Sequence, residues 1–253
     1  MPFPDMVSED SWSYKSLTAA VEAGLLKGGN GRLNPYDNIT RAEMITIVLR
    51  ALGLNNSKER DLTAFEGNVS SFTDVHKSDW YSDEIAMAYK LKLLNGTSGS
   101  EMSPNGIVSR EQAFTILCRL MRLNTSGADV SALSKFSDAV SLSAWAKPYA
   151  GAMAAAGYVS GSAGVLNPKG NITRQEFVQL MYNLFERNYI SEQKDADAMS
   201  GQTVTGNLIV SGGDITLTGL TVNGDVLIGD GVGNANATLN GVKISGRLIV
   251  RGG

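Results

Sequence analysis

Residues 38–43 read NITRAE, and this stretch sets the start of a helix. Thr40 and Glu43 have the spacing of a capping box, in which each side chain accepts the backbone N–H of the other residue. Arg41 then lies in the first helical turn, where the helix dipole disfavours a cation by about 0.3–1 kcal/mol. The pattern returns twice, in VSREQ at residues 108–112 and in ITRQE at residues 172–176. Three arginines at the unfavourable end of a helix call for a common cause.

A wider self-comparison finds three copies of one unit. Each copy contains, in order, an aspartate after a phenylalanine, a tryptophan, a glycine-rich loop, a proline and the arginine with its capping box, at spacings of 64 to 69 residues between copies. The aspartates are Asp5, Asp74 and Asp138, the tryptophans are Trp12, Trp80 and Trp145, and the loop glycines are Gly28, Gly96 and Gly161. The arginines are Arg41, Arg110 and Arg174, and the capping pairs are Thr40 with Glu43, Ser109 with Gln112 and Thr173 with Glu176.

Each unit is predicted to be a helix, a loop and a second helix. Apolar residues recur at helical spacing after Trp12 and again from residue 42 to Gly53, which is a typical glycine cap. Pro148 favours the first helical turn, which puts Trp145 at the helix entrance. Because one helix pair cannot bury its apolar face alone, we expect the three units to pack around a pseudo-threefold axis with grooves between neighbours.

The sequence changes character after Arg187. Residues 188–202 are polar and are predicted to be a linker, whereas GNLIVSG, GDVLIGDG and GRLIVRGG recur at about 20-residue spacing from Thr203 onward. This resembles the coils of a parallel β-solenoid, and we expect the chain to belong to a longer protein. The predicted boundaries are repeats at 1–54, 72–123 and 136–187, connections at 55–71 and 124–135, the linker at 188–202 and a truncated β-solenoid segment at 203–253.

The ordered series FPD, W, G, P and ITRAE, present three times between residues 3 and 187, resembles the S-layer homology (SLH) family. The resemblance implies a mainly α fold, a three-pronged spindle whose grooves bind secondary cell wall polymer. That polymer is a peptidoglycan-linked anionic glycan with pyruvylated, N-acetylmannosamine-type units. It further implies that the three arginines pair with the anionic groups, while the aspartates, tryptophans and loop glycines shape the grooves. The second unit departs from the family motif at Glu111 and Gln112.

The same residues favour a site for an acidic glycan on physical grounds. A helix N-terminus can offer unpaired N–H groups to an anion, and an arginine there adds a fork that pairs with a carboxylate. Glycines permit close approach of a sugar, and an indole face can stack on its C–H groups. Each residue also has a structural interpretation, since the hydroxyl residues cap helices, tryptophans pack in cores and aspartates shape turns. Replacing Arg41 or Arg174 by alanine is expected to weaken wall binding without unfolding the protein.

Composition and motifs bear on other functions. A net charge of −3 without a basic tract argues against nucleic acid, and no apolar run has the length of a membrane span. Cys118 lies among apolar neighbours and is predicted to be a buried thiol, while His76 is predicted to be a solvated loop residue. No catalytic or nucleotide-binding motif is found, so neither enzymatic activity nor a cofactor is expected. The three aspartates of the β segment resemble coil corners more than an acid pair: Asp214, Asp225 and Asp230.

The sequence therefore predicts non-covalent anchoring of an exported protein to the wall of a Gram-positive bacterium, at the S-layer or cell surface, with any signal peptide removed or absent. A second interpretation is that the chain is the targeting module of a polysaccharide-degrading enzyme whose catalytic site lies in the β-solenoid or beyond it. A third interpretation makes the β segment a rigid stalk or a surface for self-assembly.

Overall fold

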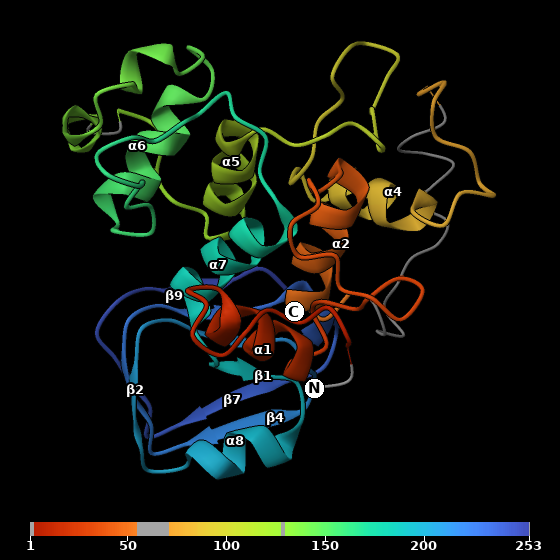
Figure 1. Cartoon of the computed structure of the whole chain (residues 1–253). Coiled ribbons are helices and arrows are strands. Elements are labelled where there is room, and N and C mark those ends of the chain that lie inside the picture. The colour runs from red at the N-terminus through yellow and green to blue at the C-terminus, as the bar shows by residue number, and fades with distance from the viewer. Residues whose placement is uncertain (1–2, 55–70, 128–129, 253) are drawn as a thin grey trace.

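The computed structural model describes residues 3–54, 71–127 and 130–252. Figure 1 shows α4, α5 and α6 in the upper part of the molecule and β2, β4 and β7 in the lower part, with α1 beside β1 between them. The predicted connection 55–71 lies, apart from Ser71, outside the described residues.

Each repeat contributes a short helix and a longer one. The pairs are α1 (Tyr14–Glu22) with α2 (Arg41–Ala51), α4 (Ser82–Lys90) with α5 (Arg110–Leu120), and α6 (Lys147–Ala155) with α7 (Arg174–Phe185). The 3-10 helices η1 (Ser131–Lys135) and η2 (Ala139–Ser141) lead into the third repeat. Several predicted local signals are confirmed, because the capping boxes of Thr40 and Thr173 form, Pro148 lies in the first turn of α6 and Gly53 follows α2 with a φ of +82°. In the second repeat Gln112 accepts the N–H of Ser109 at 3.0 Å, while the N–H of Gln112 donates to the carbonyl oxygen of Ser109 at 3.1 Å.

The segments before the three long helices close a ring of backbone hydrogen bonds. The N–H of Ile39 donates to Ile172 O at 3.0 Å, the N–H of Ile172 donates to Val108 O at 3.0 Å, and the N–H of Val108 donates to Ile39 O at 3.1 Å. The helices follow the same cycle, since α2 packs on α4, α5 packs on α6 and α7 packs on α1. Each long helix therefore contacts the short helix of the next repeat, and one hydrophobic core runs through all three repeats.

The C-terminal region consists of short parallel strands in three sheets. The first sheet is formed by β1 (Tyr189–Ile190), β3 (Leu208–Val210), β6 (Val226–Ile228) and β9 (Leu248–Val250). The second is formed by β2 (Thr203–Thr205), β5 (Thr221–Asn223) and β8 (Lys243–Ile244), and the third by β4 (Ile215–Thr218) and β7 (Ala237–Asn240). A 3-10 helix, η3 (Asp230–Val232), follows β6.

The two central strands of the first sheet, β3 and β6, are buried on both faces. Leu208 and Val226 point into the core of the β region, whereas Ile209, Leu227 and Ile249 join the core of the helical repeats. This double burial explains the unbroken apolar runs LIV in β3 and VLI in β6, since a sheet with one solvated face would alternate apolar and polar residues. In β9 only Ile249 is buried, while Leu248 and Val250 are exposed.

The segment 188–202 is folded, which corrects the predicted linker. It contains β1, which pairs with β3, and helix α8 (Gln193–Met199), which packs on β4. Although the segment is mostly polar, Ile190 and Ala196 are buried in the core of the β region. Two well-placed apolar residues are enough to fix such a short segment, and composition alone does not show this.

The β region rests on the ends of the helices through close backbone contacts. The N–H of Gly231 donates to Leu52 O at 2.7 Å, and a Cβ added at Gly231 would lie 2.5 Å from the carbonyl carbon of Gly53. At α5, Arg251 donates from Nε to Asp230 at 2.8 Å and from Nη1 to the carbonyl oxygen of Arg119 at 3.3 Å. Only glycine permits the backbones to approach so closely at the first contact.

Candidate functional site

The motif arginines reach across the boundaries between repeats. Arg174 donates from Nε to Leu33 O at 2.8 Å and from Nη1 to the carboxylate of Glu43 at 2.7 Å. Arg110 repeats this arrangement with Leu166 O at 3.0 Å and Glu176 at 3.0 Å. Each of these arginines therefore pairs with the capping-box glutamate of the next repeat.

Arg41 makes a different pair of contacts. Its Nε donates to Met102 O at 3.0 Å, in the same way as the other two arginines, but its Nη2 donates to Asn95 O at 2.8 Å. The capping residue opposite it is Gln112, whose Oε1 accepts the N–H of Ser109 at 3.0 Å. Within the described residues Arg41 thus has no ion pair, although it is only 6% exposed, and its burial lowers its pKa while the charge of Asp74 opposes this shift.

The other departure in the second repeat, Glu111, also lies at a boundary. It is buried, and its carboxylate accepts the N–H of Ser143 at 3.0 Å and an N–H of Lys169 at 2.7 Å. It therefore ties the second repeat to the third.

The helix N-termini are not free to bind an anion, which corrects the expectation of unpaired N–H groups there. The N–H of Arg41 donates to Gly106 O at 3.0 Å and that of Ala42 donates to Pro104 O at 2.9 Å. The first two N–H groups of α5 and of α7 are bonded in the same way to the loop of the neighbouring repeat. The ring of repeats brings these carbonyl groups to the helix ends, so the first two N–H groups of each long helix are bonded within the protein.

The motif aspartates and glycines shape the loops. The carboxylate of Asp138 accepts the N–H of Leu166 at 2.8 Å and that of Asn167 at 2.7 Å, and these bonds, led by the one from Leu166, lower its pKa. Asp5 and Asp74 hold the corresponding loops with the same pair of bonds. A Cβ at any of the three glycines would lie 2.8 Å or less from the ring of the motif phenylalanine in the same repeat. The pairs are Gly28 with Phe3, Gly96 with Phe72 and Gly161 with Phe136.

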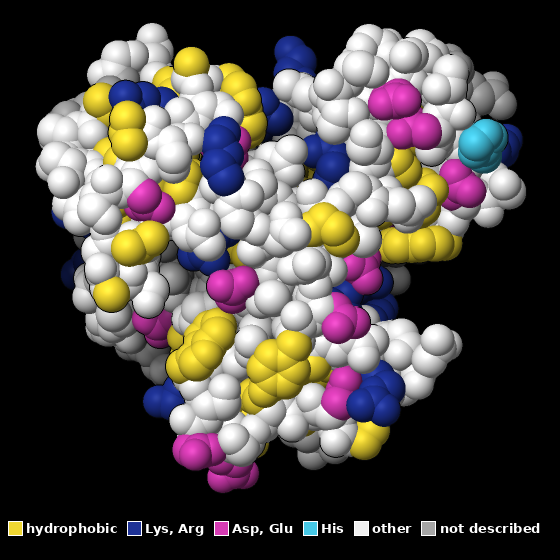
Figure 2. All heavy atoms as spheres, turned by 45° about the horizontal axis from the view of Figure 1, so that its top comes forward, with side chains coloured by type: hydrophobic (Ala, Val, Ile, Leu, Met, Phe, Trp, Pro, Cys, Tyr) yellow, Lys and Arg dark blue, Asp and Glu magenta, His cyan; other side chains and the backbone are white. Residues whose placement is uncertain are grey.

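The three tryptophans remain available to a ligand. Trp12, Trp80 and Trp145 are 59%, 61% and 51% exposed, and each lies two residues before the short helix of its repeat. On the face of the molecule drawn in Figure 2, hydrophobic side chains form separate patches rather than one apolar surface. An exposed indole at a fixed position suits stacking on a sugar ring.

One groove brings several predicted residues together. A cavity of about 290 Å³ is lined by Gly28 and Glu43 of the first repeat, Trp80 of the second and Arg174 of the third. It also contains Lys27, Thr46 and Arg50, which the sequence analysis did not propose. We refer to this cavity as the Trp80 groove.

A sequence signal for Arg50 exists. It lies nine residues after Arg41, and the residues at the same distance from Arg110 and Arg174 are Arg119 and Asn183. All three donate to the carbonyl oxygen of the residue three positions after the short helix of their own repeat, namely Leu25, Leu93 and Tyr158. The recurrence was hidden because the third copy carries an amide in place of a guanidinium.

Residues outside the grooves behave as expected for structural positions. His76 is exposed and lies 3.6 Å from Asp79, and Cys118 is buried, so that desolvation raises its pKa to about 11. Asp225 and Asp230 pair with Arg247 and Arg251, respectively. Across the described ranges no cluster of three His, Cys, Asp or Glu side chains could hold a metal ion, and no described helix is long and apolar enough to cross a membrane.

Comparison with known proteins identifies the repeats. The family described as "S-layer homology domain" matches residues 2–45, 71–114 and 135–178. The chain therefore belongs to the S-layer homology family, whose domains anchor proteins to the cell wall, and this indicates a location at the cell surface.

Three curated relatives extend this result. A surface-layer 125 kDa protein of Lysinibacillus sphaericus is 34% identical over 69% of this chain and 14% of its own length. The S-layer protein sap of Bacillus anthracis is 31% identical over 71% of this chain and 20% of its own length. An endoglucanase of Bacillus sp. (strain KSM-635) is 24% identical over 93% of this chain, which includes the β region, and 25% of its own length. The chain thus spans between a seventh and a quarter of the length of these relatives.

Proposed function

We propose that this chain holds an exported protein on the wall of a Gram-positive bacterium by binding a pyruvylated secondary cell wall polymer in the grooves between its repeats. The observation that carries the proposal is the Trp80 groove, which is lined by an exposed indole and by cations that come from more than one repeat. The indole supplies a stacking surface for a sugar, and the cations supply partners for its acid group.

The arginine retains capacity for a ligand after its internal contacts are made. A guanidinium has five N–H donors, and the contacts of Arg174 with Leu33 and Glu43 use two of them. Lys27 and Arg50 line the same cavity and add positive charge. The acid group of the polymer is thus recognised by several cations together, while Glu43 fixes the orientation of Arg174.

The test is binding of the whole chain to purified walls. Trp80→Ala should weaken binding by about two- to twelvefold, because a stacked aromatic contact is worth about 0.5–1.5 kcal/mol. Tyr36→Ala is the matched control, since Tyr36 is 68% exposed and does not line the Trp80 groove. Walls stripped of the polymer should bind none of these proteins, that is, neither the wild type nor the two variants.

Wild-type binding to stripped walls would refute the choice of polymer. Unchanged binding of Trp80→Ala, and also of Trp12→Ala and Trp145→Ala, would refute the grooves as the site. The β-solenoid remains part of the proposal, because three parallel sheets with strands at a regular interval are the arrangement that such a coil requires.

The alternative function is that of a targeting module in a polysaccharide-degrading enzyme. It is favoured by the endoglucanase relative, whose similarity covers nearly the whole chain. Both functions use the same wall-binding grooves, and they differ in the protein that is attached. Sequencing the complete gene and assaying its product on wall and plant polysaccharides would separate them.

A further inference from the structure

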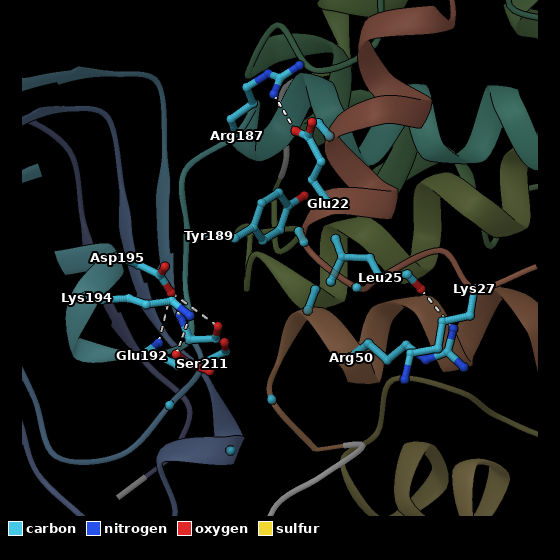
Figure 3. Close-up of a pocket in the computed structure, with 18 of the residues that line it drawn as sticks. Glu22, Leu25, Lys27, Arg50, Arg187, Tyr189, Glu192, Lys194, Asp195 and Ser211 are labelled. Atoms are coloured by element: carbon cyan, nitrogen blue, oxygen red, sulfur yellow. Dashed lines mark hydrogen bonds and ion pairs between the residues drawn. The ribbon is translucent and has the colours of Figure 1, made fainter. Parts of the chain in front are cut away.

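A second cavity lies between the first repeat and the β region. Its volume is about 820 Å³, compared with about 290 Å³ for the Trp80 groove. Figure 3 shows Leu25, Lys27 and Arg50 on one side of it, and Glu192, Lys194 and Asp195 on the other. We refer to this cavity as the junction cleft.

The junction cleft and the Trp80 groove share two cationic residues. Lys27 and Arg50 line both cavities, so the stretch of surface that connects the cavities carries these two cations. Burial lowers the pKa of Arg50, the charge of Glu84 opposes this, and the nearby charge of Arg174 lowers it further. A polyanion lying over this stretch would relieve the repulsion between the two guanidinium groups.

The walls of the junction cleft suit a polar, hydroxyl-rich chain. Glycines and serines make up much of its lining, among them Gly24, Gly212, Gly213 and Ser211, so backbone groups and hydroxyls are accessible there. Its ion pairs are exposed, with Arg187 to Glu22 at 2.6 Å and Lys194 to Glu192 at 2.6 Å. Exposed pairs of this kind contribute little to stability, so their cations can turn to a ligand at small cost.

The shape of the junction cleft is set by the fold. A Cβ at Gly53 would lie within 2.9 Å of the carbonyl group of Ser211, and the N–H of Gly231 donates to Leu52 O at 2.7 Å. Ile209 and Leu227 are buried in the core of the repeats. The β region is thereby fixed against the first repeat, and a pre-formed cleft costs a ligand less ordering free energy than one that must close.

We propose that the junction cleft binds the sugar units that follow the one held in the Trp80 groove, so that the β region takes part in recognition of the wall polysaccharide. The inference rests on the proposed function and extends it, because it makes the ligand a length of anionic polysaccharide rather than one sugar unit. The polymer enters at Trp80, passes over Lys27 and Arg50 and continues between α1 and α8.

The test compares two probes by calorimetry on the whole chain. One is the pyruvylated N-acetylmannosamine monosaccharide, and the other is secondary cell wall polymer fractionated to several repeating units. Ala23→Trp fills the junction cleft from the exposed end of α1 without altering a charge or the Trp80 groove, and Lys194→Ala removes one cation from the opposite wall. Lys243→Ala is the matched control, an exposed lysine on β8 outside both cavities.

We expect Ala23→Trp to weaken polymer binding about tenfold, which corresponds to a loss of about 1.4 kcal/mol of binding free energy. Lys194→Ala should weaken polymer binding about three- to fivefold. Monosaccharide binding should stay unchanged in both, and the control should match the wild type with both probes. Two results would overturn the role of the cleft but leave the proposed function standing. In the first, the variants lose affinity equally for both probes. In the second, neither variant loses affinity although the wild type binds the monosaccharide. A wild type that binds neither probe would overturn the proposed function and the cleft together.

Discussion

Replacing Gln112 by glutamate should stabilise the protein, because it supplies the carboxylate that Arg41 lacks. In the other two repeats the capping glutamate does two tasks. Glu43 accepts the N–H of Thr40 with Oε2 at 3.0 Å and contacts Arg174 with Oε1 at 2.7 Å. Gln112 performs the first task with Oε1, so its amide NH₂ occupies the place from which a second carboxylate oxygen would face Arg41.

The size of the effect follows from the two existing pairs. A hydrogen bond to a charged group contributes about 1.5–3 kcal/mol, and solvent reduces this at an exposed partner. The glutamate side chains of the existing pairs are 32% and 34% exposed, while their arginines are 10% and 17% exposed. We therefore expect Gln112→Glu to add about 1 kcal/mol, or about 2–4 °C in Tm for a chain of this size.

The assay is thermal unfolding followed by circular dichroism at neutral pH, combined with a double-mutant cycle. Arg41→Met retains much of the side-chain volume and removes the charge, so the gain from Gln112→Glu should vanish in that background. A gain that persists without Arg41 would show that the glutamate acts through the helix dipole. Unchanged or lower stability of Gln112→Glu alone would refute the equivalence of the three boundaries.

Two further predictions follow from buried groups. Arg174→Ala should lower the free energy of unfolding by about 2 kcal/mol in denaturant titrations, because it leaves Glu43 and Leu33 O without their donor. Weaker wall binding of this variant would then accompany lower stability. An unchanged denaturation midpoint would refute the prediction. Cys118 has a pKa of about 11 in the folded protein and about 8.5 in the unfolded chain, so it should contribute stability that is complete below pH 8.5 and lost toward pH 11. Cys118→Ala should remove that part of the pH dependence of stability. The same pH dependence in the variant and the wild type would contradict this prediction.

The local features of the fold could be predicted because each is encoded within a few residues. The capping boxes, the glycine after α2 and the proline in α6 act over one helical turn, and repetition in three copies separates them from chance. The tryptophans could be placed at helix entrances for the same reason, but their exposure could not, since it depends on how the neighbouring repeat packs.

The features that sequence analysis missed are long-range. The N–H of Arg174 bonds to Asp37 O, a residue far earlier in the chain, so an N-terminus that looks free locally is in fact satisfied. The strand and helix at 189–199 depend on two buried residues whose partners come later, in the sheet and in the core beneath it. The position of Lys27 and Arg50 in the lining of both cavities likewise depends on how the chain folds, and the sequence does not show it.

The arginine at the start of each long helix now has a physical explanation that does not require a ligand. The positive end of the helix faces carbonyl oxygens of the neighbouring loop, and the guanidinium donates to a carbonyl of that same loop, so the cation lies among partial negative charges. A residue that conflicts with local preference thereby marks a contact between repeats. Because Trp80, Arg174 and Glu43 come from three different repeats, the Trp80 groove exists only when the ring is closed. The Trp80 groove therefore forms only together with the folded triplet, which is a physical reason for three copies rather than one.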